Sequence, residues 1–337
     1  LANAATNFVS DPVARCHAGI AAIAVKTGSR VVTNEDIAAM GPDWQAEEIF
    51  KSFGIKSRFW VAEGETALTL AVDVSRKVLK SKGLALTDID LILVSTGSPL
   101  EVTPSLACMV LGELSKDVAG DPPLIQAVDI SAACSGFLYA LQQAHDFLVV
   151  KPDARVLLIT AETLSRNTEM ADEGPVFGDA ATASIVVGTS HRSEMKLFVE
   201  RPVLGASGED GSILRVPRDP AKKIFMDGPK TFVAAVRNML LFLERACAQS
   251  GVKAPDLDLV IPHQANQRIL NAVRQKAKLP EEKVYSMIAD YGNTSSSSIP
   301  LCLERLMKDL PIGQTWGLVA FGGGFTFGGA VVRTREK

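Results

Sequence analysis

The sequence has little of several features that mark well-known classes of protein. It contains no C-x-x-C pair, and its cysteines are odd in number and widely scattered: Cys16, Cys108, Cys134, Cys247 and Cys302. Neither a zinc site nor a disulfide framework is therefore expected, and reduced thiols are favoured. An apolar run of about 18 residues is also missing, so no membrane-spanning helix is expected. The net charge of −3 gives no reason to expect binding to nucleic acid.

Little in the N-terminal segment points to targeting. Residues 1–14 lack the charged-then-apolar order of a secretory signal, so we expect a loose extension and a cytoplasmic protein. The chain of 337 residues is long enough for one large domain or two tightly packed halves.

What the chain does contain is an internal repeat. G-L-A-L-T-D-I-D-L-I-L-V at 83–94 resembles G-V-K-A-P-D-L-D-L-V-I-P at 251–262. Two further pairs follow in the same order: R-V-L-L-I-T-A (155–161) with W-G-L-V-A-F (316–321), and F-G-D-A (177–180) with F-G-G-A (327–330). One such pair could arise by chance, but three pairs in the same order favour a duplication. The repeat is twofold and does not form a solenoid array.

The predicted strands are apolar throughout, as in Leu91–Val94, Val156–Thr160 and Leu318–Phe321. Strands that are buried on both faces have this composition, which is typical of layered α/β folds. We therefore expect two similar halves, 15–190 and 191–337, that stack sheets and helices about a pseudo-dyad. The N-terminal half carries Cys134, the C-terminal half carries His263 and Asn293, and we expect these groups to meet at the junction.

Cys134 lies in D-I-S-A-A-C-S-G-F (129–137), where a buried strand ends and a helix begins. The helix is predicted from apolar residues at helical spacing: Phe137, Leu138, Leu141, Ala144 and Leu148. A cysteine in the first turn faces the positive helix end, which favours the thiolate. A thiolate can attack a thioester and hold its acyl group. The structural alternative is a small buried residue, the usual fate of a free cysteine.

Two later motifs supply partners for the thiol. His263 follows the buried run L-V-I-P, and Asn293 lies in Y-G-N-T-S (291–295). Side chains at strand ends are where sites collect in α/β sheets. An imidazole N–H and an amide N–H together would stabilise a thioester enolate without protonating it. His263 is otherwise a hydrogen-bonded core histidine, and Gly-Asn is otherwise a simple turn.

The segment F-G-G-G-F-T-F-G-G-A (321–330) is rich in glycine but is not a dinucleotide fingerprint, because it lacks G-x-G-x-x-G spacing and a following helix. Its glycines can bring backbone N–H groups close to a substrate carbonyl, with Gly323 as the second oxyanion donor beside Cys134. A tight bend between two strands is the structural alternative.

Taken together, A-A-C-S-G-F, P-H-Q-A-N-x-R-I, G-N-T-S-x-x-S-x-P, F-G-D-A, V-V-T-N-E-D-I-A and A-F-G-G-G-F-T-F-G resemble the 3-oxoacyl-[acyl-carrier-protein] synthase III family of the thiolase superfamily. The resemblance implies a five-layered αβαβα fold with mixed sheets, built from two duplicated halves. It also implies a homodimer whose substrates are acyl thioesters and an acyl carrier protein, with no metal or redox cofactor.

The resemblance also implies roles for individual residues. Cys134 corresponds to the acylated nucleophile, and His263 and Asn293 to the pair that binds the malonyl thioester during decarboxylation. The N–H groups of Cys134 and Gly323 correspond to the first oxyanion hole.

Substrate and carrier contacts are implied for Asn266 and for Arg268 at the tunnel mouth. Arg274, Lys276 and Lys278 could extend the attraction for an acidic carrier protein, although a solvated basic helix face is the alternative.

Two departures from the family bear on the primer. The Trp and Arg that clamp the adenine of coenzyme A fall near Glu48 and Glu173 here, and acids at these places should weaken coenzyme A binding. Thr103 replaces a larger residue in the dimer-crossing loop, so we expect room for more than two acyl carbons. A primer other than acetyl-coenzyme A, or one that arrives on a carrier protein, is expected.

Four functions are considered from the sequence. Decarboxylative condensation needs all three of Cys134, His263 and Asn293 and is favoured. A non-condensing acyltransferase that passes the acyl group from Cys134 to an alcohol or amine is the alternative. A silent binding subunit is disfavoured by the intact Cys–His–Asn set, and a thiolase by the lack of a second cysteine in the C-terminal glycine-rich turn.

Overall fold

The computed structural model describes residues 16–41, 43–168, 174–209, 211–216 and 224–335. The expected extension at 1–14 and Glu173 lie outside these residues. Fourteen strands are described: β1 (Ala18–Thr27), β2 (Arg30–Thr33), β3 (Ser57–Trp60), β4 (Leu91–Ser95), β5 (Gln126–Ile130), β6 (Arg155–Glu162), β7 (Ala180–Gly188), β8 (Leu197–Val199), β9 (Val203–Ala206), β10 (Leu214–Arg215), β11 (Phe225–Met226), β12 (Leu259–Pro262), β13 (Thr315–Gly322) and β14 (Thr326–Thr334).

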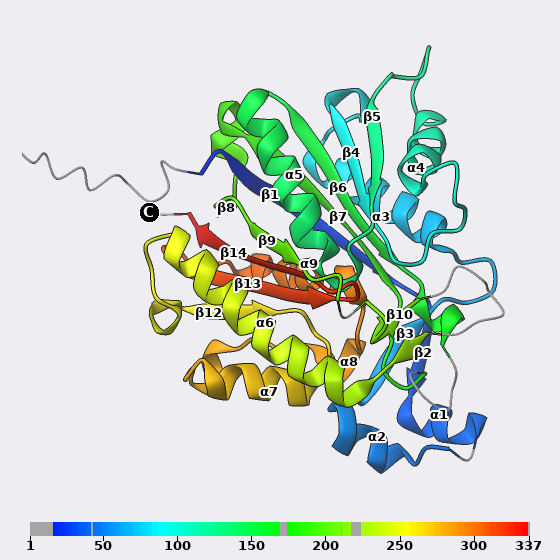
Figure 1. The fold of residues 1–337 in the computed structure, drawn as a ribbon. Coiled ribbons are helices and arrows are strands. Elements are labelled where there is room, and N and C mark those ends of the chain that lie inside the picture. Colours follow the sequence, from blue (N-terminus) through cyan, green and yellow to red (C-terminus); the bar gives the residue numbers. More distant parts are fainter. Residues whose placement is uncertain (1–15, 42, 169–173, 210, 217–223, 336–337) are drawn as a thin grey trace, which may run out of the picture.

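The described helices alternate with these strands along most of the chain (Figure 1). They are α1 (Asn34–Met40), α2 (Ala46–Phe53), α3 (Ala67–Lys82), α4 (Leu106–Ser115), α5 (Gly136–Val150), α6 (Gly228–Gln249), α7 (Gln267–Lys276), α8 (Ile288–Tyr291) and α9 (Ser298–Leu306). Short 3-10 turns that matter below are η2 (Leu86–Asp88), η3 (Ala133–Ser135), η4 (Leu164–Asn167), η6 (Ala254–Asp256) and η8 (Ser295–Ser297). Within the described part of the chain, no helix combines the length and the apolarity that a membrane crossing requires.

The sheet uses one strand arrangement twice. In the N-terminal half the order is β1-β7-β6-β4, with β5 added at the edge, and in the C-terminal half it is β8-β14-β13-β12. In each half the first two pairs of this order are antiparallel and the third is parallel. The helices α3 and α6 also precede equivalent units, since η2 and β4 follow the first and η6 and β12 follow the second. The structure therefore repeats the unit that the sequence repeats.

The two halves are joined by hydrogen bonds rather than merely stacked. Strand β1 pairs with β8, so the ladder runs on from one half into the other, and ten strands form one mixed sheet. This continuity is not visible in the sequence, because β8 is only three residues long. The domain boundaries that we expected near residue 190 stay a prediction.

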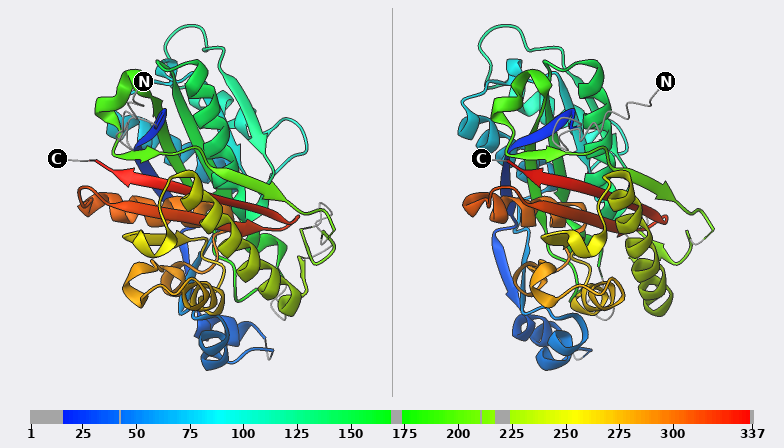
Figure 2. Two further views of the ribbon diagram at one scale, coloured as in Figure 1. Left: turned by 60° about the vertical axis from the view of Figure 1, so that its left-hand side comes forward. Right: turned by 90° about the vertical axis from the view of Figure 1, so that its left-hand side faces the viewer.

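Figure 2 shows two further views of the helices and strands that form the layers. Three hydrophobic cores lie between these layers. One packs α3 and α4 against one face of the N-terminal strands. The central core packs α5 and α9 between the two sets of strands. The third packs α6 and α7 against the far face of the C-terminal strands. The predicted five-layered αβαβα fold is confirmed, and α5 and α9 are its buried middle layer.

Local sequence explains where the elements begin and end. Helix α3 starts at Thr66, whose hydroxyl accepts from Thr69 N, and stops at Gly83, which adopts the left-handed conformation (φ 64°). Strand β6 is buried along seven of its eight residues, and it is longer than predicted because it includes Glu162. A carboxyl side chain is therefore placed inside the molecule, where β6 ends and the site begins.

Candidate active site

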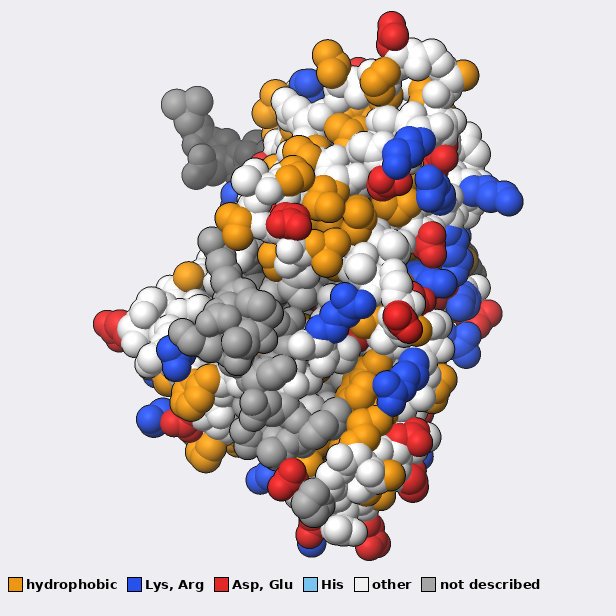
Figure 3. Space-filling view, turned by 90° about the vertical axis from the view of Figure 1, so that its right-hand side faces the viewer, with side chains coloured by type: hydrophobic (Ala, Val, Ile, Leu, Met, Phe, Trp, Pro, Cys, Tyr) orange, Lys and Arg blue, Asp and Glu red, His pale blue; other side chains and the backbone are white. Residues whose placement is uncertain are grey.

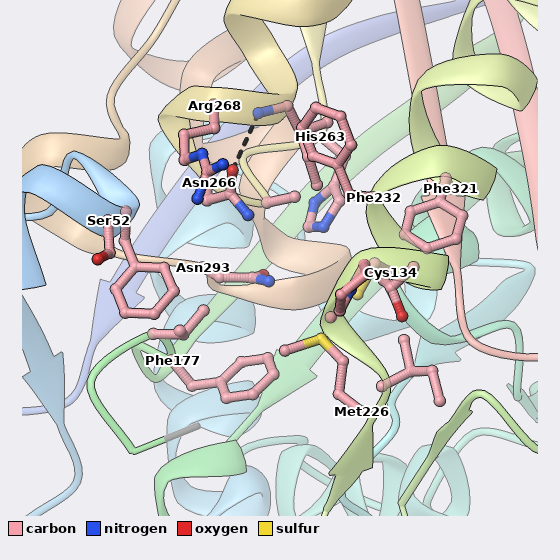
Figure 4. Close-up of a pocket in the computed structure, with 18 of the residues that line it drawn as sticks. Ser52, Cys134, Phe177, Met226, Phe232, His263, Asn266, Arg268, Asn293 and Phe321 are labelled. Carbon is pink, nitrogen blue, oxygen red and sulfur yellow. Dashed lines mark hydrogen bonds between the residues drawn. The ribbon is translucent and has the colours of Figure 1, made fainter. Parts of the chain in front are cut away.

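Cys134, His263 and Asn293 face one cavity of about 610 Å³, although they lie far apart in the sequence (Figure 4). A volume of this size suits a small-molecule site. Apolar and aromatic side chains form much of the rest of the wall: Trp44, Phe53, Val176, Phe177, Leu214, Met226, Phe232, Val233, Ala265, Ile269 and Phe321. The structure thus brings together the three side chains that the sequence singled out and surrounds them with an apolar lining.

Cys134 is placed by the turn between β5 and α5, as predicted. It lies in the 3-10 turn η3, directly before the first residue of α5, and its side chain is partly exposed to the cavity. The residue before it, Ala133, has a left-handed backbone (φ 46°), which is uncommon for a residue with a side chain. The turn is held by Ser135, whose hydroxyl contacts Ala132 O and Thr326 Oγ1 at 2.8 and 2.7 Å. The nucleophile candidate is therefore fixed to the C-terminal half through β14.

The electrostatics of Cys134 differ from our expectation. Burial raises the pKa of its thiol to about 12, and the nearby Glu162 carboxyl raises it further, whereas a hydrogen bond from Ser295 acts in the opposite direction. Removing a thiolate from water outweighs what the helix end can supply. The thiol is therefore protonated at neutral pH, and attack on a thioester requires a group that accepts its proton.

His263 follows β12 directly, and burial lowers the pKa of its imidazole to about 3, so the ring is neutral at physiological pH. Its Nδ1 lies 2.7 Å from Ser298 Oγ, which also accepts from Gln264 N at 3.3 Å. We assign the hydroxyl proton of Ser298 to Nδ1 of His263, which places the single proton of the neutral ring on Nε2. The Nε2–H is then left to point into the cavity as a donor.

Asn293 is held in the cavity wall by backbone and side-chain hydrogen bonds. Its N–H donates to Val176 O and its carbonyl accepts from Gly178 N, while its side-chain oxygen accepts from Ser295 N at 2.9 Å. Since the oxygen is engaged, the side-chain NH₂ is the free end of the amide. His263 and Asn293 thus present two neutral donors to one cavity, the arrangement that stabilises an oxyanion.

The glycine-rich turn between β13 and β14 approaches the thiol closely. A Cβ added to Gly322 would stand 2.8 Å from Cys134 N and 3.0 Å from Ser135 N, so only glycine fits there. Gly323, the predicted oxyanion donor, comes next in the chain, and a Cβ at this position would meet Leu214 at 3.3 Å. The turn is therefore a tight bend that also approaches the thiol at Gly322, and the role of Gly323 as an oxyanion donor stays a prediction.

The predicted substrate contacts divide into two groups. Asn266 and Arg268 line the cavity, and Asn266 also caps α7 by accepting from Ile269 N at 2.9 Å. Thr103 is exposed in the loop before α4 and does not line this cavity within the single chain. Glu48 is exposed on α2 and is likewise absent from the cavity wall. In the described ranges no group of three or more His, Cys, Asp or Glu side chains is arranged to hold a metal ion.

The sequence interpretation missed three residues that contact the site. Ser298 orients His263, Ser295 contacts Cys134, and Glu162 lies behind Ser295. Two signals were present in the sequence: an acidic residue at the end of an otherwise apolar strand, and four consecutive serines after Asn293. A buried charge and a polar run at a strand end each need hydrogen-bond partners, and here they provide them for one another.

Comparison with known proteins agrees with this geometry. Residues 128–200 match the family model for 3-oxoacyl-[acyl-carrier-protein (ACP)] synthase III, and residues 247–334 match the model for its C-terminal part. The chain is 36% identical over 322 residues to the beta-ketoacyl-[acyl-carrier-protein] synthase III of Oleidesulfovibrio alaskensis, which covers 90% of this chain and 95% of the relative.

Solved structures resemble the whole described fold. The 3-oxoacyl-[acyl-carrier-protein] synthase III of Aquifex aeolicus superposes with a TM-score of 0.84 at 36% identity, covering 94% of this chain and 99% of the other. The priming beta-ketosynthase of the R1128 polyketide biosynthetic pathway gives 0.82 at 29% identity, covering 96% and 98%. The similarity therefore includes both halves of the sheet.

Proposed function

The chain belongs to the 3-oxoacyl-[acyl-carrier-protein] synthase III family, and from this membership we propose that it catalyses a decarboxylative Claisen condensation. An acyl primer moves from its carrier to Cys134. Malonyl-acyl-carrier-protein then loses CO₂, and the resulting carbanion attacks the acyl-Cys134 carbonyl to give a 3-oxoacyl-acyl-carrier-protein, as in fatty acid or related polyketide biosynthesis. The observation that carries this proposal is the convergence of Cys134, His263 and Asn293 on one cavity.

In the acylation step, the N–H groups of Cys134 and Gly323 are proposed to bind the oxyanion that forms as sulfur attacks. The close approach of the β13–β14 turn to Cys134 N supports this role. Backbone donors fixed in this way stabilise a tetrahedral intermediate without reorganising during the reaction. The bond from the acyl carbon to the carrier sulfur then breaks, and the acyl group stays on Cys134.

In the decarboxylation step, His263 Nε2–H and the Asn293 amide are proposed to bind the malonyl thioester oxygen as enolate charge develops there. The low pKa of His263 supports a role as a neutral donor rather than an acid. An imidazolium would protonate the carbanion and end the reaction without a new C–C bond. Charge is stabilised through hydrogen bonds alone, so we propose that no metal or redox cofactor takes part.

The carrier protein is proposed to approach over α7. Arg268 lies on this helix at the cavity, and Arg274 and Lys276 follow it in the last turn. Basic side chains at the entrance attract an acidic partner at long range and guide its docking. Because Glu48 on α2 stands near the place of a Trp that binds adenine in the family, we propose that coenzyme A binds weakly. Because Thr103 is smaller than the residue that the family often has there, we propose that the primer has more than two acyl carbons.

We also propose a homodimer. Strand β5 is the last strand of the sheet order and pairs only with β4 within the described residues, and Val128 on it is almost half exposed. Hydrophobic side chains gather on the face of the molecule that carries this edge (Figure 3). An unpaired, partly apolar edge favours pairing with a second copy. The exposed Thr103 would then reach the site of the partner subunit.

Intact-protein mass spectrometry and CO₂ release test the proposed function. The chain is exposed to a panel of acyl-coenzyme A and acyl-carrier-protein thioesters of increasing length, and the mass added to Cys134 identifies the primer. Labelled malonyl-acyl-carrier-protein is then added. Release of CO₂ with formation of a 3-oxoacyl product supports condensation, whereas acyl uptake without CO₂ release supports the non-condensing acyltransferase. Uptake of acetyl alone would contradict the predicted pocket length.

A further inference from the structure

Glu162 is a carboxyl group that the proposed mechanism has not used, and the fold buries it completely at the end of β6. Its Oε1 accepts from Ser295 Oγ at 3.1 Å and from Ser296 Oγ at 2.5 Å and N at 3.4 Å. Its Oε2 accepts from Gly97 N at 2.9 Å and from Ser98 Oγ at 3.4 Å. All of these donors are neutral, so the charge of a carboxylate is shared over hydrogen bonds and not cancelled by a cation.

Ser295 connects this carboxyl group to the reacting sulfur. Its Oγ lies 3.5 Å from Cys134 Sγ and 3.1 Å from Glu162 Oε1. The residue is buried, its backbone is left-handed (φ 51°), and its N–H is bound to Asn293, so the hydroxyl has little freedom. A hydroxyl has one proton and two lone pairs, and it can accept from the thiol while it donates to the carboxylate.

The titration behaviour of the groups fits a proton transfer in this direction. Burial raises the pKa of Glu162 to about 7, so the group exchanges protons near neutral pH. The Cys134 thiol, with a pKa of about 12, needs an acceptor, and His263, with a pKa of about 3, is a poor one. The charge of Glu162 acts on the thiol of Cys134. Of the other titratable groups near Glu162, Glu101 and Arg166 are exposed. Asp179, which precedes the β7 residue paired with Glu162, is buried and accepts from Ser165 Oγ, Ser165 N and Val61 N.

We propose that Ser295 relays the proton of the Cys134 thiol to Glu162 during acylation and returns it after condensation. This inference rests on the proposed function and deepens it. As sulfur attacks the thioester, its proton passes to Ser295 Oγ and the Ser295 proton passes to Glu162 Oε1. The primer carrier leaves as a thiolate and takes a proton from solvent. In the second half-reaction Cys134 leaves as a thiolate and recovers the proton held by Glu162, while CO₂ departs from malonyl.

Rates of acylation as a function of pH test the relay. Single-turnover uptake of the primer is followed by intact mass spectrometry from pH 5 to 9 in the wild type and in the variants Glu162→Gln, Ser295→Ala and Ser297→Ala. We expect the wild-type rate to rise with pH through about 7. The first two variants should lose about 100-fold in rate and also lose this pH dependence. Ser297→Ala is the matched control, since its Oγ bonds Thr160 and Ala180 O and not Glu162.

A purely electrostatic role of Glu162 predicts the opposite result for Glu162→Gln. If Glu162 acts only by repelling a thiolate, removing its charge lowers the pKa of Cys134, and Glu162→Gln acylates as fast as the wild type or faster. That outcome overturns the relay while acyl uptake and CO₂ release by the wild type leave the proposed function intact. A wild type that takes up no acyl group from any thioester contradicts the proposed function itself.

A measurement on the wild type alone covers the case in which a variant does not fold. The acylation burst is measured at pH 8 in mixtures of H₂O and D₂O. Because the relay moves two protons, from Cys134 Sγ to Ser295 Oγ and from Ser295 Oγ to Glu162, the rate should fall along a curve as the deuterium fraction rises. A straight-line dependence, or none, indicates that two protons do not move together and overturns the proposal.

Discussion

Each donor of the site is oriented by a neighbour that does not itself react. Ser298 directs the imidazole of His263, and Ser295 N fixes the amide of Asn293. Both neighbours belong to the same serine run, so a single turn sets the direction of two hydrogen-bond donors. An oxyanion site depends on this kind of preorganisation, because donors that must rotate during the reaction lose much of their effect.

Replacing Asn293 with Asp separates the two half-reactions. The carboxylate keeps the shape and still accepts from Ser295 N, but it presents a negative oxygen to the developing enolate where the amide presents a proton. We expect CO₂ release from malonyl-acyl-carrier-protein to fall by about 100-fold or more. Acyl uptake at Cys134, measured on the same sample by mass spectrometry, should change by less than about 10-fold. Equal loss of both activities would contradict the assignment.

Glu162 also couples folding stability to pH. Its pKa rises from 4.5 to about 7 on folding, so between these values the folded state binds more protons than the unfolded state. Stability from this group is therefore present at low pH and is lost as pH rises towards 7, by on the order of 3 kcal/mol in total. Urea unfolding at pH 5 and pH 8 should show a smaller loss of stability for Glu162→Gln than for the wild type. An unchanged pH dependence would contradict the raised pKa.

At this scale the sequence predicted the reactive residues but not their partners. Cys134, His263 and Asn293 each follow a recognisable motif at the end of a buried strand or turn. The contact between Glu162 and Ser295 joins residues 133 positions apart, and nothing local marks it. The prediction of a Cys134 thiolate was wrong. A helix end can be recognised in a sequence, whereas the loss of water around a side chain depends on tertiary packing.

Among the elements, the β13–β14 turn has the least tolerance for change. It supplies Gly322 at a point where the backbone of η3 leaves no room for a side chain. Strand pairing from Thr315–Arg333 to Gly322–Thr326 fixes the turn, so it cannot move away without breaking the ladder. The turn that connects β13 and β14 is therefore also one wall of the acylation site.

Replacing Gly322 with Ala should abolish acylation, because the new side chain forces the backbone of η3 at Cys134 to shift. The new methyl group would stand 2.8 Å from Cys134 N and would displace the substrate oxygen from that donor. We expect acyl uptake to fall by about 100-fold or more. Gly112→Ala in α4 is the matched control, since a Cβ there meets nothing within 4 Å. Normal acylation by Gly322→Ala would exclude this position from the oxyanion site.

For the whole molecule, the open edge at β5 determines assembly. Val128→Lys places a charge on the strand edge, where pairing with a second copy would bury it. We expect light scattering after size-exclusion chromatography to report a monomer for this variant and a dimer for the wild type. Ile312→Lys is the control, because Ile312 is also exposed but lies in the loop before β13. A dimer in both variants would place the interface elsewhere.

The layered architecture could be predicted from the sequence because the repeat and the wholly apolar strands constrain it strongly. The repeated order of strands follows from the same pattern. The joining of the two halves could not be predicted, because β8 has only three residues and its pairing with β1 and β14 is set by tertiary contacts. Short strands of this kind carry no periodicity from which to recognise them.

The pairing of β1 with β8 has a consequence for how the protein handles water. A ladder that crosses between the halves leaves no hinge, so the lobes cannot close over a reactant as many two-lobed enzymes do. Water must then be excluded from the acylated sulfur by the acyl chain itself, which fills the apolar cavity. A primer too short to fill it leaves solvent beside the thioester. Wasteful hydrolysis, measured as free acid, should rise as the acyl chain is shortened.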